Sequence, residues 1–355
     1  MKQEVRKNKT YLILSMRHLG DAVVVAGFIN ALSEQCKNIE VDVVGRGELK
    51  GVTDAFCTVR EYISIDLPMF GHHRRNAAAF LDAIRKILLL RNRKYDWCIN
   101  LMGDMRENLV GHIVGAKEVI APVWQSTHLF RRHIRIMQSP PRGSGVGEIP
   151  SSIAGYYASI EYFAQQLGLR GLCWPKLMIN CPQQEKRRVV GIHPGASHPS
   201  KQWPAAKWGE LIQVLVRKEY SVRIYGSPSE AAELHREYHA EIANFGLEVA
   251  AGEMPSFLQS LLTSDLLVCM DSFSSHAAHA VGIPAVVLHG PFDPSVMTPP
   301  TGIPLSAGSM CGVFPCYNGR SCKNTDAKYI CVQGIEVKAV VEAVEAMIGH
   351  IRARK

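Results

Sequence analysis

The sequence predicts an α/β protein built from two doubly wound domains, each with a mostly parallel sheet. Three observations lead to this prediction: a length of 355 residues, apolar strands that alternate with helices, and a restart of the same alternation near residue 189. The length exceeds one ordinary domain and suits two of similar size. A composition of 47% hydrophobic and 20% charged residues is typical of a globular enzyme with a full core.

In the first half, the first apolar run is followed by a Gly-Asp turn, and later apolar runs are separated by helical stretches. Strands are expected at 11–15, 39–44, 63–66 and 97–101, and helices at about 22–32, 77–91 and 153–167. Strands that alternate with helices imply parallel βαβ units. A stretch rich in Ser, Pro and Gly at 139–151 interrupts this pattern and predicts a mobile loop.

The second half repeats the pattern after a segment rich in Pro, Lys and Arg at 174–188. Strands are expected at 189–193, 221–225, 266–270 and 285–288, and helices at 205–218, 229–243, 274–281 and about 335–351. We therefore expect an N-terminal domain of residues 1–178 and a C-terminal domain of 179–355, with a boundary inside 170–188. The final helix could also pack back on the first domain. Two such domains facing each other would place a ligand cleft between the carboxyl ends of their strands.

The net charge of +8 is unevenly distributed. Residues 1–188 contain 27 Lys and Arg against 17 Asp and Glu, whereas residues 189–355 contain 13 against 15. This asymmetry suggests that the first half meets an anionic partner, such as a phosphorylated glycolipid, a membrane surface or nucleic acid. A basic surface kept for solubility is the alternative.

No stretch of the sequence is apolar enough to span a membrane. The most apolar N-terminal stretch, residues 11–32, is interrupted by Arg17, His18 and Asp21. The basic start is not followed by a clean apolar core and a small-residue cleavage site, as a signal peptide would require. We therefore expect a cytoplasmic protein. Six of the ten cysteines are scattered, which does not suit a secreted disulfide scaffold.

The first candidate site follows the first expected strand, at Leu19-Gly20-Asp21. A carboxylate after a Gly turn at the end of a strand would point towards a cleft and lie at a helix N-terminus, where the helix dipole favours its ionised form. Such a carboxylate could act as general base for a hydroxyl. An ordinary helix N-cap is the alternative. A dinucleotide fingerprint is excluded because no G-x-G-x-x-G accompanies the motif.

The second candidate site follows the first strand of the second half, at His193-Pro-Gly195-Ala-Ser197 and Lys201. Gly195 permits a close backbone approach, and the helix that follows offers free N–H groups to a phosphate. Lys201 could supply a point charge to a diphosphate leaving group. The alternative is an exposed lysine on a turn.

The third candidate site lies between an apolar strand and a small-residue helix. Asp271 can accept hydrogen bonds from sugar hydroxyls, while Ser274 and Ser275 can donate to phosphate oxygens. His276 could join them or be an ordinary helix residue. Glu230, which follows another strand, could accept from ribose hydroxyls or be a first-turn Glu beside a helix cap.

These motifs occur in order along nearly the whole chain, followed by Gly290-Pro-Phe-Asp-Pro294. Together they resemble the ADP-heptose–lipopolysaccharide heptosyltransferases, which are GT-B enzymes of glycosyltransferase family 9. The resemblance implies two Rossmann-like domains and an inverting transfer from ADP-L-glycero-D-manno-heptose to an inner-core sugar of lipopolysaccharide, without a catalytic metal. Phe273 is bulkier than the small residue typical of the family at that position, and 72–75 and 139–151 match no known pattern.

The resemblance also implies roles for the candidate residues. Asp21, next to Gly20, becomes the general base. Lys201 contacts the donor phosphate, Glu230 the ribose and Asp271 the heptose hydroxyls. Ser274, Ser275 and His276 then line the diphosphate and sugar site. The basic first half suits an anionic, lipid-linked oligosaccharide acceptor at the cytoplasmic face of the inner membrane. The guanidinium groups expected to bind it are Arg74, Arg75, Arg106, Arg131, Arg132 and Arg135.

Four cysteines, Cys311, Cys316, Cys322 and Cys331, fall within 21 residues. Four thiols in one loop could bind a structural Zn²⁺ or Fe ion tetrahedrally. The spacing lacks the tight pairs of a zinc ribbon, so two disulfides or four free thiols remain open. A reducing cytosol disfavours the disulfides. A bound metal would order the loop near 291–300 and take no part in the transfer.

Two other readings of the function remain beside heptose transfer. A family-9 relative could use another nucleotide sugar, or glycosylate a protein or small natural product. A basic module for nucleic acid or membrane surfaces belongs to a different class. The sequence lacks the aromatic-interleaved basic stripes and the helix-turn-helix signature of nucleic-acid binders, so we expect no nucleic-acid partner. An NAD-dependent dehydrogenase would need the absent glycine fingerprint.

Overall fold

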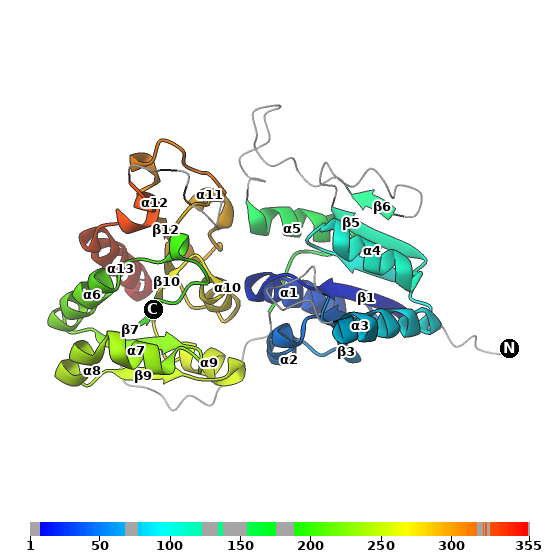
Figure 1. Cartoon of the computed structure of the whole chain (residues 1–355), viewed down its shortest axis with the longest axis horizontal. Helices are drawn as coiled ribbons and strands as arrows, with labels where there is room; N and C mark the ends of the chain where they lie inside the picture. Colours follow the sequence, from blue (N-terminus) through cyan, green and yellow to red (C-terminus); the bar gives the residue numbers. More distant parts are fainter. Residues whose placement is uncertain are drawn as a thin grey trace. The chain divides into compact units, whose positions relative to one another are not determined.

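The structure is a computed structural model of the chain, and it describes residues 8–67, 77–122, 134–137, 155–174, 188–317, 322, 324 and 327–353. The chain divides into two compact units. The first unit comprises residues 1–154 and 158–175, and the second comprises 155–157 and 176–355. Each unit contains one six-stranded sheet flanked by helices (Figure 1). The prediction of two doubly wound α/β domains is confirmed.

All strand pairs in both sheets are parallel. The first sheet has the order β3 (Glu61–Ser64), β2 (Ile39–Gly45), β1 (Lys9–Ser15), β4 (Trp97–Asn100), β5 (Glu118–Pro122) and β6 (Ile134–Met137). The second has the order β12 (Gly302–Leu305), β11 (Ala285–Leu288), β10 (Leu266–Met270), β7 (Val189–His193), β8 (Ser221–Gly226) and β9 (Glu248–Ala251). If the strands of each sheet are numbered from one in chain order, both sheets have the order 3-2-1-4-5-6 that is typical of nucleotide-binding folds. The second sheet is then read from β9 to β12.

Most helices lie between successive strands of one sheet, as parallel pairing requires. Those of the first sheet are α1 (Leu19–Gln35), α2 (Lys50–Phe56), α3 (Ala77–Leu90), α4 (Met105–Val114) and α5 (Tyr156–Gln166). Those of the second are α6 (Ala205–Arg217), α7 (Ala231–Glu237), α8 (His239–Phe245), α9 (Met254–Leu261), α10 (Phe273–Ala280), α11 (Pro294–Met297), α12 (Ile330–Gln333) and α13 (Val337–Ala353). Helices α5, α12 and α13 follow the last strand of their sheet. The single helix expected at 229–243 is two helices that meet at Tyr238, whose side chain is buried in the core.

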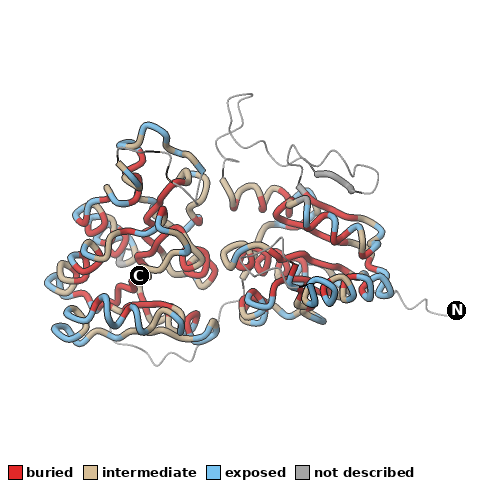
Figure 2. The backbone as a smooth tube through the Cα atoms, viewed as in Figure 1, coloured by how far each residue is buried: buried red, intermediate tan, exposed pale blue. Residues whose placement is uncertain are grey.

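The first sheet is covered on both faces (Figure 2). Leu12 and Leu14 of β1 point to the face that α3 and α4 cover with Ala83, Ile87 and Val110. On the other face α1 is almost wholly buried and packs against α5 through the rings of Phe28 and Phe163, whose centroids are 6.4 Å apart. Burial on both faces explains why β1 has an uninterrupted apolar sequence instead of an alternating one.

The second sheet has its own apolar core. Trp208 of α6 and Val340 and Val344 of α13 pack on strands β7, β8, β10 and β11 in this core. The apolar face of the final helix is therefore covered within its own unit. No helix among the described residues is long and apolar enough to cross a membrane.

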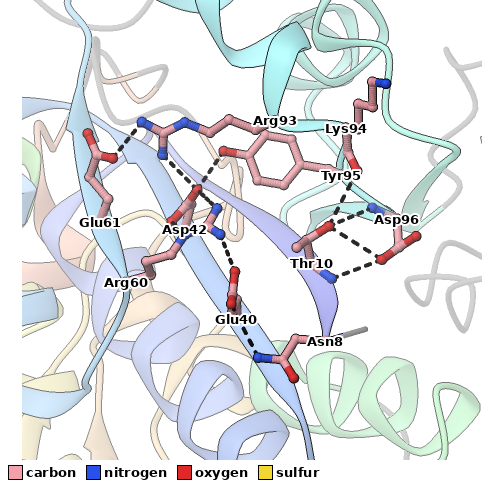
Figure 3. A network of polar contacts seen from close by, with 10 residues as sticks. All are labelled: Asn8, Thr10, Glu40, Asp42, Arg60, Glu61, Arg93, Lys94, Tyr95 and Asp96. Carbon is pink, nitrogen blue, oxygen red and sulfur yellow. Dashed lines mark hydrogen bonds and ion pairs between the residues drawn. The ribbon is translucent and has the colours of Figure 1, made fainter. Parts of the chain in front are cut away.

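A buried carboxylate ties strand β2 to the segment before β4 (Figure 3). Asp42 is fully buried and accepts hydrogen bonds from Arg60 Nε at 2.9 Å, Arg93 at 2.9 Å and the Tyr95 hydroxyl at 2.6 Å. Burial alone would raise the pKa of Asp42, but the hydrogen bonds from Arg60, Tyr95 and Arg93 hold it below its usual range. The network therefore supports the fold as an ionised cluster.

The strand order places a topological switch point in each sheet, between β1 and β4 in the first and between β7 and β10 in the second. At a switch point the crossover helices leave to opposite sides, so the loops after the two strands part and leave a crevice where ligands of such folds bind. Three of the four sequence candidates follow these strands: Gly20-Asp21 follows β1, the His193 motif follows β7 and Asp271 follows β10.

Candidate functional site

Asp21 lies in the first turn of α1, where 19% of its side chain is exposed. The helix begins at Leu19, three residues earlier than expected, with His18 as its N-cap residue. Asp21 is therefore a first-turn residue and not the cap. The helix N-terminus places a partial positive charge beside the Asp21 carboxylate. Arg17 Nε lies 3.9 Å from Asp21 Oδ2 and supplies a second positive group.

A second Gly-Asp pair follows β4, on the other side of the same switch point. Asp104 caps α4, because its Oδ1 accepts from the Arg106 N–H at 2.9 Å. The buried Asn100 side chain holds the turn by accepting from the N–H groups of Met102 and Gly103. Burial alone would raise the pKa of Asp104, but the hydrogen bonds from Arg106 lower it. Asp104 is therefore ionised at neutral pH.

Glu107, in the first turn of α4, is fully buried. Its Oε1 accepts from the Met16 N–H at 3.1 Å, and within the described chain its Oε2 has no hydrogen-bond partner. Burial raises the pKa of Glu107 to about 8, and the neighbouring Asp104 and Asp21 carboxylates act in the same direction. Glu107 is thus a neutral acid at pH 7 that fixes the turn leading to Asp21.

The structure describes two of the six arginines expected to bind the acceptor. Arg106 is exposed and paired with Asp104 at 2.6 Å, so its charge is largely compensated. Arg135 lies in β6, for which only the backbone is described. Arg74, Arg75, Arg131 and Arg132 lie outside the described residues. The acceptor-binding role of these arginines stays a prediction.

In the second unit, Lys201 and Asp271 meet across the switch point. Lys201 Nζ lies 2.8 Å from Asp271 Oδ2 and 3.0 Å from the Asp271 carbonyl oxygen. Asp271 is buried, whereas 20% of the Lys201 side chain is exposed. Burial alone would raise the pKa of Asp271, but the charge of Lys201 lowers it below its usual range. Asp271 is therefore ionised, and Lys201 is the more exposed member of the pair.

The loop after β11 completes the surroundings of Lys201. The Phe292 ring lies under the ammonium, with Nζ 4.4 Å from the ring centroid. A Cβ on Gly290 would lie 2.2 Å from the Ser200 carbonyl oxygen, so only glycine allows this loop to approach. His289 is fully buried, and its Nε2 lies 2.8 Å from the Thr298 hydroxyl. Burial lowers the pKa of His289, which is therefore neutral at pH 7.

The His193 motif is held against Glu230 from the neighbouring strand β8. Glu230 Oε2 accepts from the Ser227 N–H at 2.8 Å and the Ser227 hydroxyl at 2.6 Å. Its other oxygen would lie 2.6 Å from a Cβ on Gly195. Burial lowers the pKa of His193, so the ring is neutral. The structure thus brings His193, Gly195 and Glu230 together at the carboxyl ends of β7 and β8, while Ser197 is exposed.

The three residues expected to line the donor site on α10 are all buried. The Ser275 hydroxyl donates to the Ser272 carbonyl at 2.8 Å, and Ser274 lies 3.0 Å from the Ser272 hydroxyl. His276 Nδ1 lies 2.9 Å from the Tyr157 hydroxyl. These contacts stabilise the start of α10, which begins two residues after Asp271, the partner of Lys201.

The four clustered cysteines all line one cavity, together with Pro291, Phe314 and Tyr329. Cys322 Sγ accepts from the Tyr329 N–H at 3.3 Å, and Cys311 Sγ from the Asn324 amide at 3.6 Å. Four soft thiols, two of which accept N–H groups here, are a donor set suited to Zn or Fe. As placed, however, no three His, Cys, Asp or Glu side chains of the described ranges converge as a metal site.

Sequence reasoning missed Asp104, Glu107, Asn100 and His289. A signal for the first three was present, because Gly103-Asp104 repeats the Gly20-Asp21 pattern after a strand. No helix was predicted after Gly103-Asp104, so this second Gly-Asp pair was not identified as a candidate site. His289 had no signal of its own, because its position depends on three strands that pair in space.

Solved glycosyltransferases have the same architecture. A family 9 glycosyl transferase from Veillonella parvula superposes with a TM-score of 0.70 at 19% identity, covering 97% of this chain and 98% of that one. The E. coli ADP-heptose lps heptosyltransferase II gives 0.67 at 16% identity, with 97% and 99% covered. The iron-containing dodecameric glycosyltransferase TibC from enterotoxigenic E. coli gives 0.53 at 15% identity, with 96% and 78% covered. The two sheets therefore have the GT-B fold of these glycosyltransferases.

Sequence comparison narrows this class to a family. The model of glycosyltransferase family 9 (heptosyltransferase) matches residues 84–325, and the chain belongs to this family. Lipopolysaccharide heptosyltransferase 2 of E. coli K12 is 24% identical over 308 residues, which cover 81% of this chain and 84% of that protein. The predicted family membership and the prediction of a glycosyltransferase are confirmed.

Proposed function

We propose that the protein is an inverting heptosyltransferase that moves a heptose from ADP-L-glycero-D-manno-heptose to an inner-core sugar of lipopolysaccharide. The observation that carries this proposal is the Lys201–Asp271 pair at the start of α10, because it combines a cation for a diphosphate with a carboxylate for sugar hydroxyls. Family membership and the names of the E. coli relatives, a lipopolysaccharide heptosyltransferase and an ADP-heptose enzyme, support the choice of sugar and acceptor.

The second unit would bind the donor. Lys201 and the first N–H groups of α10 attract the diphosphate, whose negative charge grows as it leaves the sugar. Asp271, fixed by Lys201, accepts from heptose hydroxyls. Glu230 accepts from the ribose, and Gly195 leaves room for its carboxylate. Ser274, Ser275 and His276 support this site by fixing the start of α10.

The first unit would supply the base. Asp21 takes the proton of the acceptor hydroxyl while that oxygen forms a bond to the anomeric carbon and the bond from this carbon to the diphosphate breaks. Attack opposite the leaving group inverts the anomeric centre in one step. Because no covalent enzyme intermediate forms, one base on the acceptor side and a cationic site for the diphosphate suffice.

We further propose that the acceptor is an anionic, lipid-linked oligosaccharide reached at the cytoplasmic face of the inner membrane. The excess of 27 Lys and Arg over 17 Asp and Glu in residues 1–188 supports an anionic acceptor. Arg106 would contact it together with Arg74, Arg75, Arg131, Arg132 and Arg135, since a guanidinium binds phosphate and carboxylate groups in two-point fashion.

The first test is a parallel calorimetric titration of the full chain with ADP, UDP, GDP and NAD. The proposal requires selective binding of ADP that weakens at least tenfold in Lys201→Ala and Asp271→Ala. Preference for UDP or GDP would keep a glycosyltransferase of family 9 but remove ADP-heptose as the donor. Failure to bind any nucleotide would favour the basic binding module.

The second test is transfer of heptose from ADP-heptose to deacylated inner-core oligosaccharide, measured as ADP release. Asp21→Asn keeps the size of the side chain but removes the base, so kcat should fall by a factor of 10² to 10⁴. Asp54→Asn, at an exposed Asp of the same unit, is the matched control and should leave kcat unchanged. Full activity of Asp21→Asn would exclude Asp21 as the base.

We also propose that the four clustered cysteines hold a structural Zn²⁺ or Fe ion. Their arrangement around one cavity supports this assignment, as does the description of the TibC relative as iron-containing. Elemental analysis of the purified protein should find close to one metal per chain, and Cys311→Ser should lower that content. Metal-free protein whose thiols are all alkylated without reductant would mean free thiols, whereas thiols protected until reduction would mean disulfides.

A further inference from the structure

Helix α3 is apolar on its outer side as well as on its inner side. Its inner residues Ala83, Ile87 and Leu90 belong to the core of the first unit. On the outside, Leu81 is 66% exposed and Leu89 55%, and Phe80 and Leu88 are exposed as well. A surface helix normally presents polar and charged residues to solvent, so four exposed apolar side chains on the outer side of α3 are unusual.

The exposed apolar residues form one continuous face. Leu81 and Leu88 are seven residues apart, which places them two turns apart on the same side of the helix. Helix α4 packs against α3 and adds Leu109, which is 40% exposed. Five of the nine large apolar side chains that are exposed in the described part of the chain lie on these two helices. Such clustering on a surface indicates a site of interaction.

Basic residues accompany this apolar face. Residues 77–94 contain five Lys and Arg and one acidic residue, Asp82. Lys86 is paired with Asp82 at 2.8 Å and Arg93 with Asp42 at 2.9 Å. The other three, Arg85, Arg91 and Lys94, are exposed. Arg85 lies one turn after Leu81, on the same outer side of α3.

We propose that this surface docks on an anionic lipid bilayer. We call it the α3 face, and its residues are Phe80, Leu81, Arg85, Leu88, Leu89, Arg91, Lys94 and Leu109. Apolar side chains between cations fit the edge of the acyl region beneath anionic headgroups. A second copy of this chain fits less well, because a symmetric contact would bring the three cations of each copy together. The proposal adds a docking surface to the proposed lipid-linked acceptor and depends on no catalytic step.

The test is co-sedimentation of the full chain with vesicles of phosphatidylcholine alone or with about one third phosphatidylglycerol. Wild type should bind the anionic vesicles and not the neutral ones, and salt should weaken its binding. Leu81→Ser/Leu88→Ser should lower the partition coefficient at least tenfold. Phe245→Ser, at an exposed aromatic residue of α8, is the matched control and should bind as wild type does.

Charge is tested separately. Arg85→Gln/Arg91→Gln/Lys94→Gln should weaken binding to anionic vesicles on the order of a hundredfold, at about fivefold per cation. The triple variant Arg217→Gln/Lys218→Gln/Lys338→Gln removes the same charge from the second unit and should have little effect. Thermal melting should show that all variants are folded. Equal binding of wild type and both α3 variants would overturn the proposal. So would a dimer that the leucine substitutions convert to a monomer.

A failure of this proposal is distinguishable from a failure of the proposed function. The vesicle assay needs no donor, and ADP binding and transfer to a water-soluble acceptor need no bilayer. Variants of the α3 face should therefore keep the ADP affinity of wild type and its kcat on deacylated acceptor.

Discussion

Lys201 Nζ and Asp271 Oδ2, 70 residues apart in the sequence, lie 2.8 Å apart across the switch point of the second sheet. The pair joins the loop after β7 to the loop after β10. It also fixes the more exposed Lys201 to Asp271, two residues before the start of α10. The pair therefore links the stability of the second unit to its capacity to bind a diphosphate.

Replacement of Lys201 by Met should destabilise the protein by about 3–5 kcal/mol at neutral pH, because it leaves a buried carboxylate without its partner. The pKa of Asp271 is lowered in the folded protein, so the stability it contributes is present above the pKa of the unfolded chain, near 4. This stability is lost as the pH falls through the folded pKa. Denaturant melts of wild type and Lys201→Met should differ most at pH 7 and converge towards pH 3.

Lys218→Met is the control for this experiment. Lys218 is paired with Glu345 on the surface, where solvent screens the pair, so its loss should change stability little. A loss of stability in Lys201→Met that does not change with pH would show that the pair is not ionic.

Gly195→Ala should weaken ADP binding several-fold with little loss of stability. The new Cβ would lie 2.6 Å from Glu230 Oε1 and 3.1 Å from the His193 ring, so the Glu230 carboxylate must move away from its Ser227 donors. Calorimetric titration with ADP measures the effect. Gly349→Ala in α13, where a Cβ meets nothing within 4 Å, should bind ADP as wild type does. An unchanged ADP affinity in Gly195→Ala would mean that Glu230 does not contact the nucleotide.

Glu107→Gln should stabilise the protein at pH 8 and leave its stability nearly unchanged at pH 4. The pKa of Glu107 is about 8 when folded and near 4.3 when unfolded. Because the folded protein binds this proton more tightly than the unfolded chain does, the contribution of Glu107 to the free energy of unfolding is greatest below about pH 4. It is lost as the pH rises towards 8, at about 1.4 kcal/mol per pH unit at most.

Glutamine does not titrate, so the difference in Tm between Glu107→Gln and wild type should grow from pH 5 to pH 8. Glu342→Gln, at an exposed glutamate of α13, should follow wild type at every pH. Parallel Tm curves for wild type and Glu107→Gln would mean that Glu107 is already ionised in the folded protein at pH 5.

Asp42→Asn should lower the free energy of unfolding by about 2–4 kcal/mol, because it removes the buried charge and replaces one of the two oxygens that accept from Arg60, Arg93 and Tyr95 with an NH2 donor. The effect is best measured by urea denaturation at pH 7. Glu40→Gln removes a half-exposed partner of Arg60 and should cost less than about 1 kcal/mol. Equal effects of the two substitutions would contradict the assignment of Asp42 as the centre of the network.

The repeat of strand and helix was readable from the sequence because both faces of a parallel sheet are buried. Residues 189–193, 266–270 and 285–288 are uninterrupted apolar runs, and each is a strand with the predicted bounds. Helix α4 and strand β12 were not predicted. In α4, the buried residues Glu107 and Asn108 are polar, so they interrupt the apolar periodicity from which a helix is predicted.

The sequence by itself determined which residues follow the strands, and hence the positions of Asp21, Lys201, Glu230 and Asp271 at the carboxyl ends of two parallel sheets. Tertiary structure alone decided what each of them contacts. Lys201 meets Asp271, Gly195 meets Glu230 and Met16 meets Glu107 only because β-strands distant in sequence pair side by side. The local sequence specifies strands and turns through periodicity, whereas burial and charge pairing depend on neighbours that only the folded chain supplies.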